Sequence, residues 1–210
     1  AVEALAARIA AHLPRAQVRG ATLAMPGALD IATPETLIYP MFMASGWFTR
    51  SELPRRLALA GAEGARVLPP FGSSPGLPAL CLQLIADSAA AQGWPPGETH
   101  LLIAAHGSGR SPAPARAARD LADQLAPHVA ATTCGFIEEA PFIADAARDL
   151  PARTICLPLF ATNADHVTGD LPDALRGAGF RGITLPPVGM AAAVPAMIAE
   201  SIKAALHERP

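Results

Sequence analysis

The sequence lacks the features that mark several protein classes. No apolar run approaches the roughly 20 residues needed to cross a bilayer, and the chain does not open on a basic and then apolar signal peptide. Charged residues make up only 16% of the chain and nearly cancel, to a formal net charge of -2. Because such a chain has no general attraction for nucleic acid or for an anionic membrane, we expect neither as a partner.

Cysteine is also scarce. The three cysteines, Cys81, Cys134 and Cys156, are an odd number without the close pairing of a redox or zinc motif. Cys134 and Cys156 lie inside apolar, strand-like runs. This pattern indicates buried free thiols in a reducing compartment rather than disulfides, and therefore a cytoplasmic protein.

Apolar residues, by contrast, make up 51% of the chain, and many of them recur in an internal repeat. The segment 37–61 matches the segment 155–179 at a constant offset of 118 residues, so that Pro40 pairs with Pro158 and Phe42 with Phe160. After one inserted residue the offset becomes 117, and 68–72 pairs with 185–189. So many matches in register indicate a duplicated fold.

The second repeat alternates short apolar runs with helical patterns. We predict strands over 101–105, 131–137, 154–160 and 182–186. We predict helices over 113–129, from Pro141 onward, over 171–179 and over 194–208. This alternation predicts an α/β protein of two homologous three-layer α/β/α repeats with mostly parallel four-stranded sheets and a cleft between them.

The repeats are predicted to occupy residues 1–94 and 98–210, joined by the turn-rich segment 93–97. At the offset of 118, the counterpart of the 101–110 segment would precede residue 1. The first repeat therefore starts on a helix predicted over 2–13 and lacks its opening strand. We expect the native protein to carry that strand upstream of Ala1.

Polar side chains follow three predicted strands of the second repeat. His106 follows the first strand, Glu138 the second and His166 the third. The carboxyl ends of parallel strands meet at one edge of a sheet, where such folds bind ligands. Two imidazoles and a carboxylate suit a divalent cation such as Fe²⁺, Co²⁺ or Zn²⁺, and they also suit proton removal.

The first repeat provides an internal control for this site. His166 matches Phe48, and Glu138 matches Leu23, so the polar residues differ while the surrounding scaffold agrees. This contrast predicts one site, built in the second repeat. The first repeat would add apolar surface, Phe48 included, for a flat organic ligand.

The ordered motifs resemble those of the sirohydrochlorin chelatases, a family of cobalamin and siroheme biosynthesis whose long form is a fused pair of homologous halves. The motifs are His106-Gly-Ser108, Phe136-Ile-Glu138 with Pro141, Pro158-Leu-Phe160, Asp165-His166 and Asp170-Leu-Pro172. The family often has an arginine directly after His-Gly-Ser, whereas Gly109 precedes Arg110 here.

The resemblance implies an enzyme that inserts a divalent metal into a tetrapyrrole. It implies that His106 and His166 bind the metal and accept pyrrole protons, with Glu138 assisting. Ser108, Arg110, Phe160 and Phe48 are the candidate substrate-binding residues. No organic cofactor is implied, and the metal, Fe²⁺ or Co²⁺ with iron favoured, is a substrate. The protein could be a monomer or a homodimer.

Other functions fit the sequence less well. The segment Gly72-Ser-Ser74-Pro-Gly76 has the spacing of a serine hydrolase elbow. However, Pro75 lacks the backbone N–H that would help to form the oxyanion hole. No G-x-G-x-x-G joins a strand to a helix and no Walker lysine is present, which argues against a nucleotide-binding fold. A non-catalytic tetrapyrrole or metal carrier with the same histidines stays an open alternative.

Overall fold

The computed structural model describes residues 2–163 and 166–208, with the side chain of His166 outside the described part. The chain divides into two units. Unit 1 comprises residues 1–74 and 192–210, and unit 2 comprises residues 75–191.

A four-stranded parallel sheet forms the centre of unit 2. Its strands are β3 (His100–Ala105), β4 (Ala131–Phe136), β5 (Thr154–Pro158) and β6 (Ile183–Thr184). Their order in the sheet is β4-β3-β5-β6. In the two central strands every residue is buried except His100, as expected where helices cover both faces of a parallel sheet.

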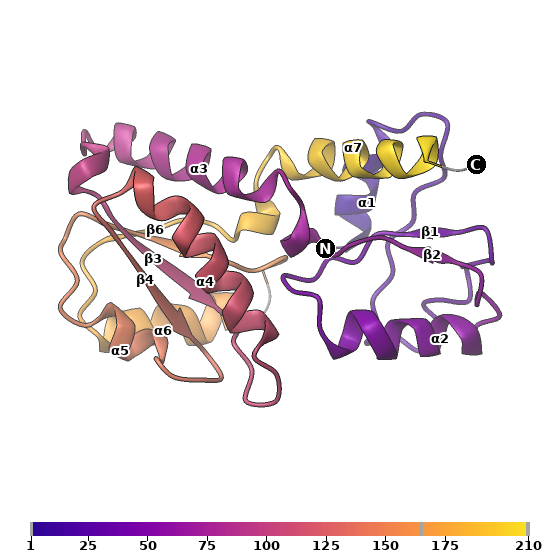
Figure 1. Cartoon of the computed structure of the whole chain (residues 1–210), viewed down its shortest axis with the longest axis horizontal. Coiled ribbons are helices and arrows are strands. Elements are labelled where there is room, and N and C mark those ends of the chain that lie inside the picture. Colours follow the sequence, from indigo (N-terminus) through magenta and orange to yellow (C-terminus); the bar gives the residue numbers. More distant parts are fainter. Residues whose placement is uncertain (1, 164–165, 209–210) are drawn as a thin grey trace. The chain divides into compact units, whose positions relative to one another are not determined.

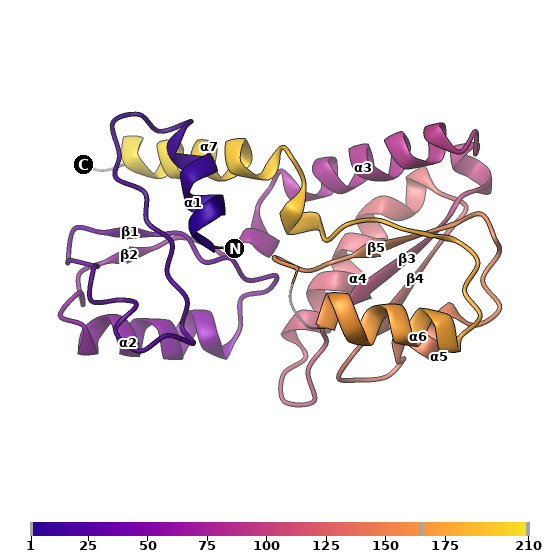
Figure 2. The ribbon, with the colours of Figure 1, turned by 180° about the vertical axis from the view of Figure 1, so that it is seen from behind.

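Helices cover both faces of this sheet. The helices α3 (Leu77–Ala91) and α4 (Ala113–Leu125) pack together on one face, whereas α5 (Ile143–Ala147) and α6 (Leu171–Gly177) pack together on the other (Figure 1). Figure 2 shows the same layers from behind, with β5 beside β3. Unit 2 is therefore the predicted three-layer α/β/α structure.

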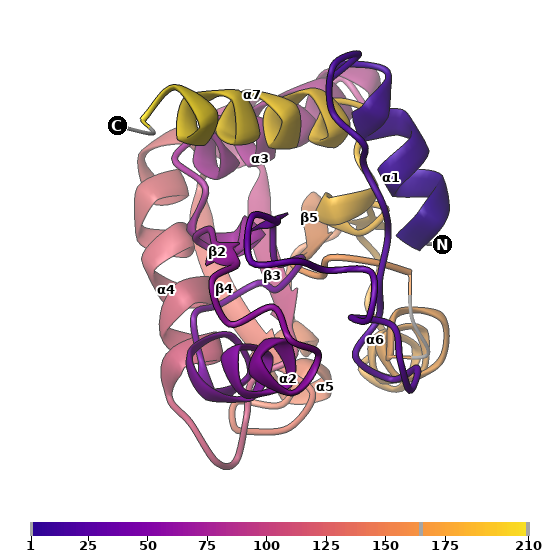
Figure 3. The same ribbon diagram turned by 90° about the vertical axis from the view of Figure 1, so that its right-hand side faces the viewer.

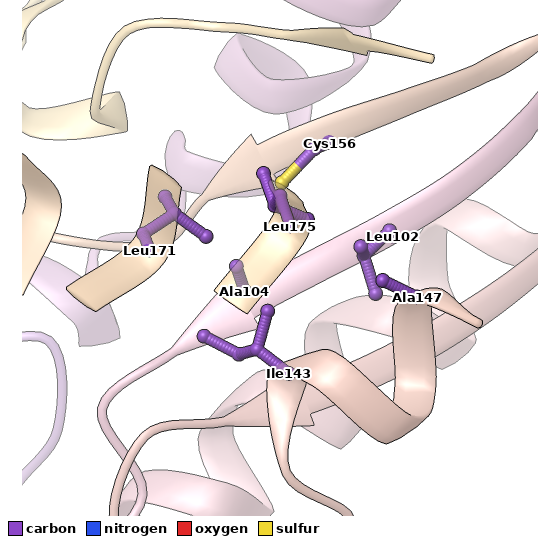
Figure 4. Packing of buried hydrophobic residues seen from close by; sticks show 7 residues of the cluster. All are labelled: Leu102, Ala104, Ile143, Ala147, Cys156, Leu171 and Leu175. Atoms are coloured by element: carbon purple, nitrogen blue, oxygen red, sulfur yellow. The ribbon is translucent and has the colours of Figure 1, made fainter. Parts of the chain in front are cut away.

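One apolar cluster joins the sheet to α5 and α6. Its members are Leu102, Ala104, Ile143, Ala147, Cys156, Leu171 and Leu175 (Figure 4). Leu102 and Ala104 of β3 belong to the same cluster as Ile143 and Leu171, the first residues of α5 and α6. The cluster therefore packs the start of both helices against the sheet. Truncating a buried leucine in such a cluster to alanine costs about 2–5 kcal/mol.

Unit 1 has a smaller sheet. The strands β1 (Leu37–Ile38) and β2 (Arg66–Val67) pair in parallel, and α2 (Leu53–Leu59) follows a π-helical turn at Phe48–Glu52. The helix α1 (Val2–Ala10) packs against α7 (Val194–His207), as Figure 3 shows. Four-stranded sheets were predicted for the repeats, the first of them without its opening strand, and the described residues of unit 1 contain two strands. The segment 20–26, which matches 135–141, forms turns instead of a strand, because Met25 N–H donates to the carbonyl of Thr22 at 3.1 Å.

The matched segments of the two repeats fold alike. The turn at Phe48–Glu52 and α2 recur 118 residues later as the turn at His166–Asp170 and α6. Gly72 N–H donates to the carbonyl of Phe42 at 2.9 Å, and Gly189 N–H donates to that of Phe160 at the same distance. A Cβ at either glycine would overlap a neighbouring carbonyl, of Met43 or of Ala161. The backbone thus repeats even in its closest contact, which confirms the predicted duplication.

The repeats do not coincide with the compact units. The closing helix of the first repeat, α3, belongs to unit 2, and the closing helix of the second repeat, α7, belongs to unit 1. The segment 93–97 connects α3 to β3 inside unit 2. Each unit therefore contains the last helix of the other repeat. The boundaries 1–94 and 98–210 stay a prediction about which sequence segments are homologous, and they are not the boundaries of the compact units.

Other expectations were close. The helix placed at Pro141 begins at Ile143, because Pro141 instead accepts a hydrogen bond from Phe136 N–H through its carbonyl. All three cysteines are free thiols; Cys81 and Cys156 are buried and Cys134 is half-buried. Burial raises the pKa of the Cys81 thiol to about 12 and that of the Cys134 thiol to about 11. Among the described residues, no helix is both long enough and apolar enough to span a membrane.

Candidate active site

The loop that follows β3 carries His106. β3 pairs with β4 up to Ala105 and Phe136. Beyond this point the His106 carbonyl accepts hydrogen bonds from Ile137 N–H at 3.1 Å and from Glu138 N–H at 2.9 Å. The ladder therefore continues past the ends of both strands, and it brings Glu138 next to His106 as predicted.

The imidazole of His106 is held from its Nδ1 side. Nδ1 lies 3.1 Å from the carbonyl oxygen of Gly107 and 3.7 Å from Oε2 of Glu138. A carbonyl oxygen can only accept, so Nδ1 carries the proton and donates it to Gly107. In this tautomer the lone pair is on Nε2, the form in which a neutral histidine binds a metal. Both side chains remain open to solvent, His106 at 41% and Glu138 at 49% exposure.

Gly107 makes the close approach of the two loops possible. Its φ is +68°, a conformation that side chains rarely adopt. A Cβ at this position would lie 2.9 Å from Cγ of Glu139 and 2.9 Å from Cβ of Phe136. The glycine of the His-Gly-Ser motif is therefore required by packing as well as by backbone conformation.

Glu139 contributes a contact that the sequence analysis did not assign. Its Oε1 accepts a hydrogen bond from the Ser108 backbone N–H at 2.7 Å, across 31 residues of sequence. Nothing in the sequence Glu138-Glu139 indicates that the two carboxylates have different partners. That difference depends on the path of the loop at Gly107, which the sequence does not specify.

The candidate substrate-binding residues of this loop are at its surface. The Ser108 hydroxyl accepts a hydrogen bond from Arg110 N–H at 3.2 Å, which closes a local turn. Arg110 is exposed. Its guanidinium can thus approach a carboxylate of a ligand, whereas the Ser108 hydroxyl already shapes the loop.

The third predicted site residue lies on the segment that follows β5. His166 begins the π-helical turn at His166–Asp170, while Asp165 and the side chain of His166 lie outside the described residues. β5 is the neighbour of β3, and Leu159 N–H donates to the carbonyl of Ala104 at 2.8 Å. The segment therefore leaves the sheet at the same edge as the His106 loop, and the pairing of the two imidazoles stays a prediction.

Phe160 was predicted to bind substrate, but its ring is 8% exposed. Its carbonyl accepts the hydrogen bond from Gly189 N–H, so the residue joins two loops of unit 2. This burial favours a packing role for Phe160.

A shallow cavity of about 490 Å³ opens at the carboxyl ends of β5 and β6. Most of its lining is apolar, and Asn163 and Val167 flank the His166 position. The lining residues are Pro158, Asn163, Val167, Leu171, Pro172, Leu175, Thr184, Leu185, Pro186, Pro187 and Met190. Sequence reasoning missed 185–190 as site residues, although the recurrence of Leu-Pro-Pro had marked the segment as part of the repeat.

Phe48 was the candidate residue of the first repeat. In unit 1 it stacks on Phe42, with ring centroids 6.0 Å apart, and meets Trp47 edge-on at 5.1 Å. Phe48 is 50% exposed and Trp47 is 60% exposed. Exposed, mutually supported aromatic rings of this kind suit contact with a flat apolar ligand.

Metal-binding groups in the described part of the chain are few. Over residues 2–163 and 167–208, no set of three His, Cys, Asp or Glu side chains is close enough to hold a metal ion. His106 and Glu138 form a pair at the edge of the sheet. A pair with open positions suits an ion that is passed on, since a structural site surrounds its metal with four protein ligands.

Comparisons with known proteins agree on one family. A model of the family described as CbiX matches residues 100–205. The solved structure of CbiX, described as the terminal enzyme for biosynthesis of siroheme in denitrifying bacteria, is 75% identical to this chain. The match has a TM-score of 0.94 and covers 97% of this chain and 90% of the other. No curated protein sequence matches the chain significantly.

Two more distant structures share the fold alone. SirB from Bacillus subtilis with Fe³⁺ is 12% identical, with a TM-score of 0.67 over 96% of this chain and 87% of its own. A multi-domain protein from Deinococcus radiodurans with structural similarity to chelatases is 19% identical, with a TM-score of 0.61 over 82% of this chain and 42% of its own. Because the family model spans half of the chain and the 75% identical structure nearly all of it, the chain belongs to the CbiX family, the sirohydrochlorin chelatases that its motifs resemble.

Proposed function

We propose that this protein is the enzyme that inserts a divalent metal, Fe²⁺ in preference to Co²⁺, into sirohydrochlorin to complete siroheme. The observation that carries the proposal is the arrangement of His106, whose Nδ1–H is donated to Gly107 while Glu138 lies beside the ring. We assign Nε2 of His106 to the metal ion, and the Glu138 carboxylate, 3.7 Å from Nδ1 of the same ring, to a pyrrole proton.

The reaction needs only groups that this site contains. Metal insertion removes the protons of two pyrrole N–H groups and replaces water on the metal by the ring nitrogens. The neutral imidazole of His106 displaces water from the incoming ion, and the Glu138 carboxylate accepts a pyrrole proton. His166 acts as the second metal-binding imidazole and proton acceptor. Both protons pass to solvent, because both described side chains are half-exposed.

Iron is favoured over cobalt by the described role of the 75% identical relative. The 75% identical relative is described as the terminal enzyme of siroheme biosynthesis, and siroheme is the iron complex of sirohydrochlorin. Imidazole and carboxylate ligands accept both ions, so the residues themselves do not discriminate. The proposed preference for iron therefore rests on this relative and on metal supply, not on the ligand set.

The substrate presents many carboxylates around an apolar macrocycle. We assign Arg110 to bind one of them, since it is exposed beside the His106 loop. Arg50 is a second candidate in unit 1, where its Nε donates to Ser45 Oγ at 3.1 Å. Phe48 and Trp47 are assigned to the macrocycle, whereas Phe160 is buried. The free thiols agree with a cytoplasmic enzyme.

An anaerobic insertion assay tests this function. The purified protein is mixed with sirohydrochlorin and Fe²⁺ or Co²⁺, and the absorption change is compared with the protein-free rate. We expect multiple turnovers with Fe²⁺, and a loss of about 100-fold or more in His106→Ala and His166→Ala. His128→Ala is the matched control, because His128 is exposed in the 3₁₀ turn Ala126–His128 that follows α4.

The outcomes separate the enzyme from a carrier. Stoichiometric binding of sirohydrochlorin with an insertion rate equal to the protein-free rate would identify a carrier and refute the enzyme. Full activity in both histidine variants would refute the site while leaving the activity in place.

A further inference from the structure

We propose that Glu139 is a positioning residue that acts on His106 through the peptide bond between Gly107 and Ser108. Two hydrogen bonds meet on this one peptide group. Its C=O, from Gly107, accepts Nδ1–H of His106 at 3.1 Å, and its N–H, from Ser108, donates to Oε1 of Glu139 at 2.7 Å. The imidazole and the carboxylate are thus linked through a single polar group.

The link has the form of a carboxylate–histidine pair with one peptide inserted. A carboxylate on the N–H end of a peptide draws that hydrogen toward itself and increases the negative charge on the carbonyl oxygen at the other end. A more negative carbonyl accepts Nδ1–H more strongly. The result is a fixed tautomer and a fixed ring orientation, as in sites where a carboxylate bonds a metal-binding histidine directly.

Packing restricts the peptide to this orientation. The Glu139 side chain lies against Gly107, where any Cβ would clash with its Cγ at 2.9 Å. His106 is itself tied to the next loop, because its carbonyl accepts the N–H of Glu138 at 2.9 Å. The hydrogen bond to Glu139 is charge-assisted and short, which makes it stronger than a neutral one.

The two adjacent carboxylates therefore have separate roles. Glu138 Oε2 lies 3.7 Å from Nδ1, too far to compete with the Gly107 carbonyl for its proton, and it stays available for a pyrrole proton. Glu139 is committed to the backbone. This division rests on the proposed function only in that His106 must bind the metal; the hydrogen-bonded relay itself is a property of the metal-free protein.

The first measurement uses the metal-free protein. Long-range ¹H–¹⁵N correlation spectra near pH 8 report which ring nitrogen of His106 is protonated. We expect the Nδ1–H tautomer in the wild type and in Glu139→Gln, whose amide oxygen can still accept from Ser108 N–H. We expect a mixture of tautomers in Glu139→Ala. An unchanged Nδ1–H tautomer in a folded Glu139→Ala variant would overturn the proposal.

The second measurement is the affinity for Co²⁺ alone, by titration calorimetry without tetrapyrrole. We expect Glu139→Ala to bind Co²⁺ about 10-to-100-fold more weakly than the wild type, as is typical when the partner of a metal-binding histidine is removed. Glu139→Gln should fall between the two, and in the insertion assay the KM for metal should rise more than kcat falls. Asp145→Asn is the matched control, since Asp145 forms an exposed ion pair with Arg148 in the same unit.

These results distinguish the relay from the function it serves. If His106→Ala binds Co²⁺ like the wild type, the proposed metal site fails, while the tautomer spectra still decide the relay. If Glu139→Ala does not fold, Glu139→Gln decides it. Wild-type Co²⁺ affinity and wild-type KM in Glu139→Gln would then leave the charge of Glu139 without a role and overturn the proposal.

Discussion

The two halves of this molecule share a backbone and differ in what they do with polar residues. In unit 1, Glu52 is 5% exposed and is bound by the guanidinium groups of Arg55 and Arg56. Its counterpart in unit 2, Asp170, is exposed. Where unit 2 has Glu138 beside His106, the matching Leu23 packs on the core of unit 1. The acid of unit 1 is buried in an ion pair with two arginines, whereas Asp170 and Glu138 of unit 2 are exposed to solvent.

The largest effect on the insertion rate is expected when site residues of the second repeat are replaced by the matching residues of the first repeat. Glu138→Leu and His166→Phe each introduce the residue of the first repeat. Each should lower the catalysed insertion rate by about 10²–10⁴-fold, because a positioned acid–base or metal-binding group is lost. The rate is measured anaerobically from the absorption change.

The reverse exchange completes this test. Phe48→His places the imidazole of the second repeat on unit 1, and we expect no second activity, because the position that matches Glu138 is Leu23 there. Glu138→Gln separates charge from shape in unit 2. Near-normal insertion rates in both Glu138→Leu and His166→Phe would show that the difference in polar residues between the two repeats is unrelated to function.

The next effect concerns the shared backbone. Gly72→Ala and Gly189→Ala each place a Cβ against a carbonyl, of Met43 in unit 1 or of Ala161 in unit 2. Such overlap costs about 1–3 kcal/mol, and we expect the two losses in the free energy of unfolding to be similar. Urea denaturation of both variants measures them. A loss of stability in one variant alone would show that the turns at Gly72 and Gly189 are not structurally equivalent.

Much of this comparison could be predicted from the sequence, since it depends on order along the chain. A polar residue directly after a buried strand must lie at the carboxyl edge of a parallel sheet, so His106 and Glu138 could be assigned there. The constant offset predicted that the turn before α2 would recur before α6. These inferences need only strand ends and register.

Other features depend on three-dimensional contacts that no local pattern encodes. The sequence does not say that α3 of the first repeat belongs to unit 2, or that α7 of the second repeat belongs to unit 1. The peptide link from Glu139 to His106 depends on the positive φ of Gly107. Phe160 was expected to face substrate, and its burial follows from the backbone contact of the Gly189 turn, which the sequence leaves undetermined.

A smaller effect should come from the aromatic rings of unit 1. Phe48→Ala removes a stacked contact with Phe42 and an exposed ring surface. An aromatic contact contributes about 0.5–1.5 kcal/mol, so the KM for sirohydrochlorin should rise about 2-to-10-fold with little change in kcat. Quenching of Trp47 fluorescence by sirohydrochlorin, measured in a Trp94→Phe background, reports the same contact. An unaltered KM together with no quenching would remove unit 1 from substrate binding.

The smallest effect is the pH dependence that Glu52 gives to unit 1. Hydrogen bonds from Arg55 and Arg56 lower the pKa of Glu52 from 4.5 to about 2. A lowered pKa stabilises the folded state fully above the ordinary value, and this contribution is lost as the pH falls through about 2. Glu52→Gln should therefore lower the Tm near neutral pH, and the difference from the wild type should shrink between pH 4.5 and 2. Glu63→Gln is the control, because Glu63 is exposed in the same unit. If the Tm difference for Glu52→Gln were constant over this range, the carboxylate would act through packing alone, and the contrast between the buried acid of unit 1 and the exposed acids of unit 2 would lose its electrostatic basis.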